Sequence, residues 1–377
     1  MTLLTTHTQT PPVTASAITL EGLGKSFADT EAVADLNLSL PAGSFLVLLG
    51  PSGCGKTTTL RMIAGLEDPS RGRITFGEKG VADGDTGSSL PTEKRGIGRV
   101  FQSYALWPHM TVRANVEWPL KVGRWDTDRR RTRSEEVLSM LGIDHLADRY
   151  PTQLSGGQQQ RVAIARTIAP SPSVVLFDEP LSNLDARLRV DTRSELVDVH
   201  RASGATSVNV THDQIEALAM ATHIAVLRDG RLEQFGTPDE LLTNPKTAFV
   251  AGFLGNPAAV LIDGTMQQKQ LTVRDQVLAA PLPVKDGTPM TAMYRPDSIG
   301  FGTPDGIGLE IMVMEATPAA GRYVITARLG KERISVVSTQ RHAVGEQLKL
   351  LLPPEPAAVF DADGQRWDTG HLSGGAA

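Results

Sequence analysis

The segment Gly50 to Thr57, GPSGCGKT, has the composition of a loop that binds phosphate groups. It matches G-x-x-x-x-G-K-[ST] and lies between an apolar run typical of a buried strand and a segment with helical character. Its glycines allow backbone N–H groups to point at phosphate oxygens, and the N–H groups at the start of the following helix add to this binding. Lys56 would reach the β- and γ-phosphates, and the Thr57 hydroxyl would bind Mg²⁺. The loop predicts a nucleoside triphosphate ligand but does not distinguish a kinase, a GTPase and an ATPase.

Two neighbouring carboxylates end the apolar segment SVVLFDEP, which reads as a buried strand. Asp178 is suited to hold Mg²⁺, either directly or through water. Glu179 could orient and deprotonate a water that attacks the γ-phosphate, which favours hydrolysis over transfer to a second substrate. The alternative is that Glu179 is an ordinary surface charge.

A Ser and two glycines open the stretch Leu154 to Arg161, LSGGQQQR, just before a polar segment with helical character. This composition also suits a phosphate. Because the first loop already surrounds the nucleotide of its own chain, a second phosphate-binding segment is most economical if it binds the nucleotide of another copy. Two chains placed head to tail would then complete each other's sites. On this stretch alone, an ordinary Gly-rich loop at a helix start remains the alternative.

These residues are expected at the ends of strands in an α/β sheet. From Ile18 to about Phe253, short β-rich apolar runs alternate with helical patterns, which indicates a mostly parallel sheet flanked by helices. We predict an α/β P-loop domain over residues 18–255, with an inserted helical subdomain at about 103–170. The Gly/Asp-rich stretch 77–96 is predicted to be a surface loop between strands.

Local turn signals support this pattern near the end of the predicted α/β domain. Asp229 and Gly230 predict the turn of a β-hairpin, and Thr237 followed by Pro238 predicts the start of a helix. After about residue 256 short alternating strands are separated by Gly, Pro and Asp. We therefore predict a small all-β barrel or sandwich over residues 256–370 without a catalytic cluster. The Thr/Pro/Ser-rich residues 1–17 predict a flexible tail.

The bulk composition narrows the class of protein. The 377 residues suffice for two domains, and the net charge of −5 argues against a nucleic-acid partner. No apolar run reaches about 18 residues and no secretory signal pattern is present, so we expect a soluble cytoplasmic protein whose membrane role comes through a partner. The single cysteine, Cys54, excludes an internal disulfide; it is either a space-filling residue or a redox-sensitive thiol at a helix N-terminus.

The order of six segments resembles the ATP-binding subunit of an ABC transporter over about residues 18–253. These segments are GPSGCGKT, VFQSY, LSGGQQQR, LFDEP, LSNLDA and VTHD. The resemblance implies a homodimer that hydrolyses ATP with Mg²⁺, with the nucleotide held between the two copies. ATP would close the dimer, and hydrolysis would reopen it.

The resemblance also implies roles that the residues alone leave open. Phe27 would stack on adenine, and His212, otherwise readable as a buried core histidine, would contact the γ-phosphate. Gln102, otherwise a polar loop residue, would lie near Mg²⁺ and the attacking water and link the site to the membrane partner. The predicted site comprises the catalytic residues Glu179, His212 and Gln102, the Mg²⁺ ligands Thr57, Gln102 and Asp178, and the nucleotide-binding residues Phe27, Gly50, Pro51, Ser52, Gly53, Cys54, Gly55, Lys56, Thr57, Thr58, Ser155, Gly156, Gly157, Gln158 and Asp185.

Within that family the sequence is similar to free-standing importer ATPases, because it has one motif set, no long coiled coil and no fused membrane span. The segment 103–116 resembles the region that docks a coupling helix of the membrane subunit, although its Tyr104 and Trp107 could equally be core residues. YRPDSI, from Tyr294, resembles the TOBE-type regulatory domain of importers. The implied partners are integral-membrane permease subunits and, indirectly, an extracytoplasmic solute-binding protein, with this chain at the cytoplasmic face of the membrane.

The sequence does not identify the solute. SYALWPHMTV resembles the iron, polyamine and phosphonate importers, whereas VFDADGQRW resembles the sugar importers. Arg99 stands where an apolar residue is more typical of the family. The alternative function from another class is a soluble P-loop ATPase that acts on nucleic acid or ribosomes.

Overall fold

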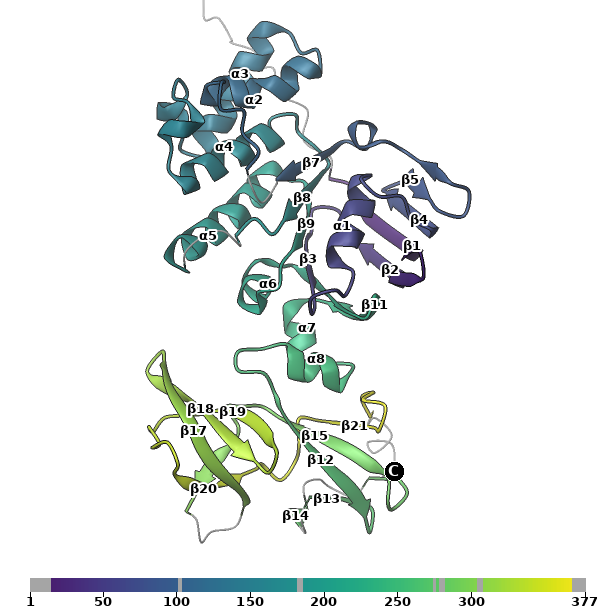
Figure 1. The fold of residues 1–377 in the computed structure, drawn as a ribbon, viewed down its shortest axis with the longest axis vertical. Helices are drawn as coiled ribbons and strands as arrows, with labels where there is room; N and C mark the ends of the chain where they lie inside the picture. Colours follow the sequence, from purple (N-terminus) through teal and green to yellow (C-terminus); the bar gives the residue numbers. More distant parts are fainter. Residues whose placement is uncertain are drawn as a thin grey trace, which may run out of the picture. The chain divides into compact units, whose positions relative to one another are not determined.

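The structure is a computed structural model that describes residues 15–100, 104–181, 186–273, 276–277, 282–303 and 308–367. The chain forms two compact units, residues 1–238 and 239–377 (Figure 1). The domain limits predicted from the sequence, 18–255 and 256–370, stay predictions. Among the described residues, no helix combines the length and the apolar character that a membrane crossing requires.

The first unit contains a six-stranded sheet and a five-stranded sheet. The first has the order β11-β10-β3-β9-β8-β7, parallel from β10 to β7, and the second has the antiparallel order β2-β1-β4-β5-β6. Their bounds are β1 Ile18–Phe27, β2 Thr30–Leu40, β3 Phe45–Leu49, β4 Arg71–Phe76, β5 Lys79–Asp83, β6 Ser88–Ser89, β7 Ile97–Val100, β8 Val174–Asp178, β9 Thr206–Val210, β10 His223–Arg228 and β11 Arg231–Gly236. The predicted α/β fold with a mostly parallel sheet is confirmed.

The central strands are buried on both faces, which explains their continuous apolar runs. Helix α1 (Lys56–Ala64) packs on one face, where its Leu60 and Ile63 join the core that contains Leu48 and Leu176. Helix α5 (Ala186–Ser203) lies on the other face, where its His200 contacts Phe45 of β3 and Ser207 of β9, and α6 (Gln214–Met220) follows β9. The sheet is therefore held between helices, with its strand ends left to carry the site.

The far end of α1 is anchored by a buried arginine. Arg95 is 2% exposed, and its guanidinium donates to the carbonyls of Met62, Ile63 and Leu90 at 2.7–3.0 Å. Two of these carbonyls belong to the last turn of α1, where backbone acceptors lack helical partners. Burial lowers the pKa of Arg95. The hydrogen bonds offset the cost of burying this charge and fix the helix whose other end carries the phosphate loop.

His200 on α5 makes the stability of this unit depend on pH. Its ring packs edge-on against Phe45, Nδ1 lies 2.9 Å from the Ser207 hydroxyl, and burial lowers its pKa below the ordinary 6.5. Because the unfolded chain binds the proton more readily, the free energy of unfolding should fall as pH decreases through about 6.5. One proton contributes a slope of at most about 1.4 kcal/mol per pH unit.

Urea unfolding between about pH 5 and 7.5 tests this prediction on the whole chain and on His200→Asn. The amide of Asn keeps a polar atom near Ser207 but does not titrate in this range. The variant should be less stable at neutral pH and should lose the part of the slope that His200 contributes. Equal slopes in the two chains would contradict the assignment to His200.

The helical subdomain predicted at about 103–170 corresponds to α2 (Val112–Val122), α3 (Thr127–Met140) and α4 (Gly156–Ile168). Each helix begins at a side-chain cap, provided by Thr111, Asp126 and Ser155 respectively. Short 3₁₀ turns at Asp144–Leu146 and Pro151–Gln153 connect α3 with α4, and a further one lies at Thr92–Lys94. Helix α4 packs on α2 and α3 and also contacts β7 of the main sheet.

The prediction that residues 77–96 form a surface loop is wrong. Residues 79–83 form β5, which pairs with β4, and β6 adds a further short strand. The physical reason is long-range pairing. Strand β4 pairs with β1, with Phe76 opposite Ile18, and its other edge is then available to pair with β5. Tertiary pairing here outweighs the low strand propensity of Gly and Asp.

The second unit is mostly β-structure, as predicted. It begins with α7 (Pro238–Thr243) and α8 (Ala248–Phe253), and Ala251 of α8 packs against Met293 and Phe360. Two five-stranded sheets follow, with the orders β14-β13-β12-β15-β21 and β16-β20-β17-β18-β19. The bounds are β12 Val260–Gln267, β13 Gln270–Val273, β14 Gln276–Val277, β15 Pro289–Tyr294, β16 Gly300–Gly302, β17 Leu309–Ala319, β18 Arg322–Leu329, β19 Glu332–Ser338, β20 Gln347–Leu351 and β21 Ala358–Phe360.

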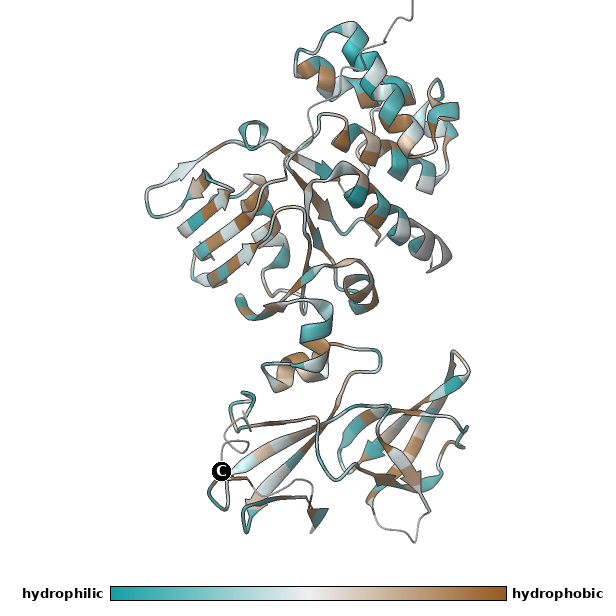
Figure 2. Ribbon diagram, turned by 180° about the vertical axis from the view of Figure 1, so that it is seen from behind, coloured by the Kyte–Doolittle hydropathy of each residue, from teal (hydrophilic) through white to brown (hydrophobic). Residues whose placement is uncertain are grey.

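Antiparallel strands in both units alternate hydrophobic and hydrophilic residues, visible as brown and teal bands in Figure 2. In β19 the inward residues Ile334 and Val336 are buried, whereas Arg333, which precedes Ile334 on the strand, is exposed. This period of two is typical of sheets with one solvated face. The β10–β11 hairpin is confirmed as well, with Asp229 and Gly230 at positive φ (48° and 78°) in its turn.

Candidate functional site

The predicted phosphate loop joins β3 to α1 and needs glycine for two reasons. Gly50, Gly53 and Gly55 all have positive φ, at 157°, 81° and 93°. A Cβ on Gly50 would lie 2.2 Å from the Leu227 carbonyl oxygen, and a Cβ on Gly55 would lie 2.5 Å from that of Ala32. The loop is therefore closely packed between its neighbours, and only a residue without a side chain fits at these two positions.

Lys56 is the first residue of α1 and points back into the loop. Its Nζ donates to the carbonyl oxygens of Gly50 and Pro51, at 2.8 Å each, and the residue is only 8% exposed. Among the residues that the structure describes, no carboxylate forms an ion pair with this ammonium. A buried cation at a helix N-terminus without an acidic partner is suited to an anionic ligand. Thr57, next in the helix, is exposed.

The sheet order brings Asp178, Glu179 and His212 to the same edge. Strands β3, β9 and β8 are parallel neighbours, so their carboxyl ends meet where ligands bind in α/β sheets. Glu179 follows β8 and His212 follows β9. Glu179 Oε1 lies 3.7 Å from His212 Nδ1, and the backbone N–H of Glu179 donates to the Val210 carbonyl at 3.2 Å. The structure thus brings together two residues that the sequence separates by more than thirty positions.

Glu179 also has a strained backbone. Its φ of 46° lies in the left-handed region, which is uncommon for residues other than glycine, asparagine and aspartate. Such strain persists where the surroundings over-determine the conformation, and it clusters at functional sites. The bond to Val210 contributes to that constraint. The carboxylate is about one-third exposed, so a water molecule can reach it.

Asp178 ends β8 and offers oxygen ligands of the kind that Mg²⁺ prefers. Its Oδ2 accepts a hydrogen bond from Arg99 Nη2 at 2.6 Å, while no described residue donates to Oδ1. Helix α1, which carries the Thr57 hydroxyl, packs on β8. The donor set therefore fits a magnesium ion that also binds phosphate oxygens and water. The sequence flagged Arg99 as atypical but gave no signal that it would reach Asp178.

Ser155 is engaged in the start of α4. Its Oγ accepts a bond from the Gln158 backbone N–H at 3.4 Å, and the Gln158 side chain accepts one from the Ser155 backbone N–H at 3.0 Å. These two bonds form a reciprocal capping box, and Ser155 and Gly156 are exposed. Figure 1 places α4 with α2 and α3, apart from α1. The two phosphate-binding candidates therefore belong to different parts of the first unit.

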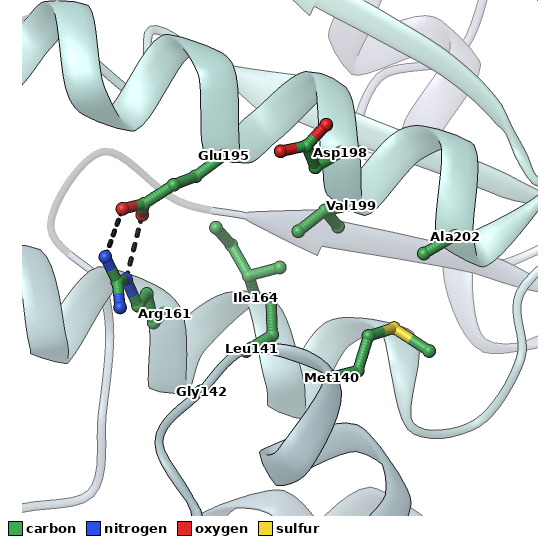
Figure 3. A pocket seen from close by; sticks show the side chains of 9 residues that line it. All are labelled: Met140, Leu141, Gly142, Arg161, Ile164, Glu195, Asp198, Val199 and Ala202. Carbon is green, nitrogen blue, oxygen red and sulfur yellow. Dashed lines mark hydrogen bonds and ion pairs between the residues drawn. The ribbon is translucent and has the colours of Figure 1, made fainter.

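Arg161, the last residue of LSGGQQQR, ties α4 to α5. Its guanidinium donates through Nε to Glu195 Oε2 at 2.9 Å and through Nη2 to Oε1, and this raises the pKa of Arg161 (Figure 3). Beside the pair lies a pocket of about 340 Å³. It is lined by Met140, Leu141, Gly142, Arg161, Ile164, Glu195, Asp198, Val199 and Ala202. None of the predicted site residues lines it, so we assign this cluster a structural role.

Phe27 is available to a ligand near the phosphate loop. The residue is 46% exposed at the end of β1 and pairs with Thr30 at the start of β2. Two residues further along β2, Ala32 contacts Gly55 of the loop. An exposed aromatic ring at this place could stack on a flat, apolar group. Lys25 Nζ lies 5.0 Å from the ring centroid, a cation–π contact.

Several predicted features have a simpler structural account or cannot be placed. Cys54 is 3% exposed within the core, which favours the space-filling alternative over a redox-sensitive thiol. Trp107 is half-buried and packs against the exposed Trp118 at 5.8 Å and under the guanidinium of Arg166, so it lies at the edge of the helical subdomain. Gln102 and Asp185 lie outside the described residues.

Known proteins resemble this chain in sequence and in fold. The family model described as "ABC transporter" matches residues 33–182. The trehalose/maltose import ATP-binding protein MalK of Thermococcus litoralis is 49% identical over 67% of this chain and 68% of its own length. The sn-glycerol-3-phosphate import ATP-binding protein UgpC 1 of Rhizobium johnstonii is 45% identical over 84% of this chain and 83% of its own length.

A third relative spans nearly the whole chain. The sulfoquinovosyl glycerol transport ATP-binding protein SmoE of Agrobacterium fabrum is 39% identical over 93% of this chain and 99% of its own length. Among solved structures, the ABC transporter component CbiO1 of Clostridium perfringens gives a TM-score of 0.54 at 30% identity, covering 59% of this chain and 89% of its own. The dimeric ABC transporter cassette MJ0796 gives 0.50 at 33% identity, covering 59% and 98%.

Proposed function

From the premise that this chain belongs to the ABC transporter family, we propose that it hydrolyses ATP to power solute import through separate membrane subunits. The observation that carries this proposal is the edge where β3, β9 and β8 end. There the phosphate loop, Asp178, Glu179 and His212 follow parallel neighbouring strands.

The residues divide the chemistry among themselves. Lys56 and the N–H groups of the loop bind the β- and γ-phosphates, and Phe27 stacks on the adenine ring. Thr57 and Asp178 hold Mg²⁺, which when bound neutralises phosphate charge and orients the γ-phosphate. Glu179 accepts the proton of the attacking water, and His212 holds the Glu179 carboxylate and the γ-phosphate in place.

Two copies are needed for a complete site in this proposal. Ser155, Gly156 and Gly157 contact the γ-phosphate bound to the other copy, and Gln158 caps the helix that presents them. Support comes from the separation of α4 from α1 within one chain and from the description of MJ0796 as dimeric. ATP then favours the closed dimer because only that state lets the nucleotide contact both copies. Gln102 and Asp185 are proposed to complete the site.

The relatives narrow the solute class. Those compared above are named for trehalose and maltose, for sn-glycerol-3-phosphate and for sulfoquinovosyl glycerol. We therefore favour a carbohydrate or glycerol derivative over iron, a polyamine or a phosphonate. The chain would act at the cytoplasmic face of the membrane on permease subunits, with a solute-binding protein outside. The β-rich second unit would be a TOBE-type regulatory domain.

The test uses the tagged chain purified with its membrane partners in lipid and supplemented with the binding protein. ATP hydrolysis is measured against sugars, glycerol phosphates, polyamines, iron(III) and aminophosphonates. Stimulation by a sugar or glycerol derivative is expected. Stimulation by iron or a polyamine would overturn the solute class. Recovery of no membrane partner, with stimulation by nucleic acid or ribosomes instead, would favour the soluble ATPase alternative.

A further inference from the structure

The ion pair between Arg99 and Asp178 places a cation on the carboxylate that would hold Mg²⁺. We propose that Arg99 is a positioning residue that orients Asp178 through one carboxylate oxygen and whose charge weakens the binding of Mg²⁺ at the other. The inference rests on the proposed function, because it assigns Asp178 to a divalent cation. It concerns how strongly ATP binding by this chain depends on that cation.

The register of the sheet puts the two side chains on one face. Arg99 on β7 lies opposite Leu176 on β8, and Asp178 comes two residues later on the same strand. Because side chains alternate along a strand, Arg99, Leu176 and Asp178 share a face. Leu176 packs in the core with residues of α1. The guanidinium therefore lies on the side of the sheet that carries α1 and its Thr57 hydroxyl.

Arg99 is well anchored at this position. Its strand pairs with β8, and the Thr167 hydroxyl of α4 donates to the Arg99 carbonyl at 3.1 Å. The side chains of Arg99 and Asp178 are only 18% and 23% exposed. Water therefore screens their charges less than at an open surface, and the guanidinium stays close to the carboxylate.

The single contact from Nη2 to Oδ2 leaves Oδ1 without a donor among the described residues. A carboxylate held at one oxygen can still offer the other to a metal, and ligating carboxylates are commonly held this way. The same arrangement brings a positive guanidinium close to a divalent cation, and like charges repel. An apolar residue at position 99 would supply neither the hydrogen bond nor the repulsion. The two effects can be separated by substitution.

The experiment measures the Kd of ATP in Mg²⁺ and in EDTA and compares the ratio of the two values. All chains carry Glu179→Gln, so that ATP stays intact. Arg99→Gln keeps a hydrogen-bond donor but no charge, Arg99→Met removes both, and Arg99→Lys keeps the charge. Arg73→Gln is the matched control, since Arg73 pairs with Asp83 on the other sheet and its side chain is 56% exposed.

We expect the Kd ratio, EDTA over Mg²⁺, to rise about fivefold or more in Arg99→Gln. The ratio should rise less in Arg99→Met, which also loses the hydrogen bond that orients Asp178, and should stay unchanged in Arg99→Lys and Arg73→Gln. An equal ratio in all chains would overturn the inference, as would a change in Arg99→Met alone, since that points to packing rather than charge. Thermal unfolding identifies a variant that fails to fold. If Arg99→Met fails, the comparison of Arg99→Gln with Arg99→Lys still tests the effect of the charge. If the parent binds no ATP under either condition, the proposed function itself fails.

Discussion

Replacement of Glu179 by Gln is expected to lower ATP hydrolysis about a thousandfold while leaving ATP binding intact. Gln has nearly the same shape but cannot accept a proton from the attacking water. In the structure the Glu179 carboxylate is partly exposed at the strand edge, with His212 at 3.7 Å as its basic neighbour. The amide can still meet that imidazole, so the site should keep its geometry. The readout is phosphate release by the chain with its membrane partners.

The same variant should trap the closed dimer, because ATP that is not consumed continues to bridge two copies. Light scattering at saturating ATP should then report a dimer. Glu195→Gln is the matched control: Glu195 pairs with Arg161 away from the predicted site, and the variant should keep its hydrolysis rate within about threefold. Undiminished hydrolysis by Glu179→Gln would refute its role as the base. A monomer with bound ATP would refute the shared site.

Lys56→Met is expected to weaken ATP binding about a hundredfold or more. The wild-type ammonium is buried in the loop and forms no ion pair with a carboxylate in the part of the chain that the structure describes, so its charge is available to phosphate at short range. The Met side chain fills the buried volume of the aliphatic part of Lys56 but leaves the Gly50 and Pro51 carbonyls without their donor. The loss should therefore appear in the Kd of a fluorescent ATP analogue, with a smaller loss of stability.

Two further variants make this result interpretable. Lys79→Met removes an exposed lysine from β5 and should leave ATP affinity unchanged. Lys56→Arg keeps the charge with a bulkier head and should bind ATP with intermediate affinity. If Lys56→Met binds ATP as tightly as the wild type while melting at a similar temperature, Lys56 is not the phosphate ligand of this loop.

The phosphate loop and its flanking elements could be predicted from the sequence because their determinants are local. Glycines at positive φ, a following Lys and Thr, and an apolar run before them all lie within about fifteen residues. The β10–β11 hairpin was equally predictable from Asp229 and Gly230, since two residues in left-handed conformations define the turn. The start of α4 at Ser155 follows from the same kind of local signal.

The pairings within the site could not be derived from local pattern. Contact between Glu179 and His212 requires β8 and β9 to be parallel neighbours, and the reach of Arg99 to Asp178 requires the register of β7 on β8. Neither relation is encoded in the residues next to each partner. The β4–β5 hairpin was missed for a similar reason, because β5 is positioned by β4, which itself pairs with β1, rather than by its own Gly/Asp-rich sequence.

The position of β3 in the middle of the main sheet has a consequence for synthesis of the chain. Its neighbours are β9 and β10, so Val47 pairs with Asn209, about 160 residues later. At roughly 5–20 residues per second, a ribosome needs on the order of 10–30 s to supply that partner. During this interval β3, which is buried along its whole length in the folded protein, lacks both of its neighbouring strands, and contacts of such long separation form slowly. Nascent chains shorter than about 230 residues should therefore depend on chaperones and gain no stability from ATP.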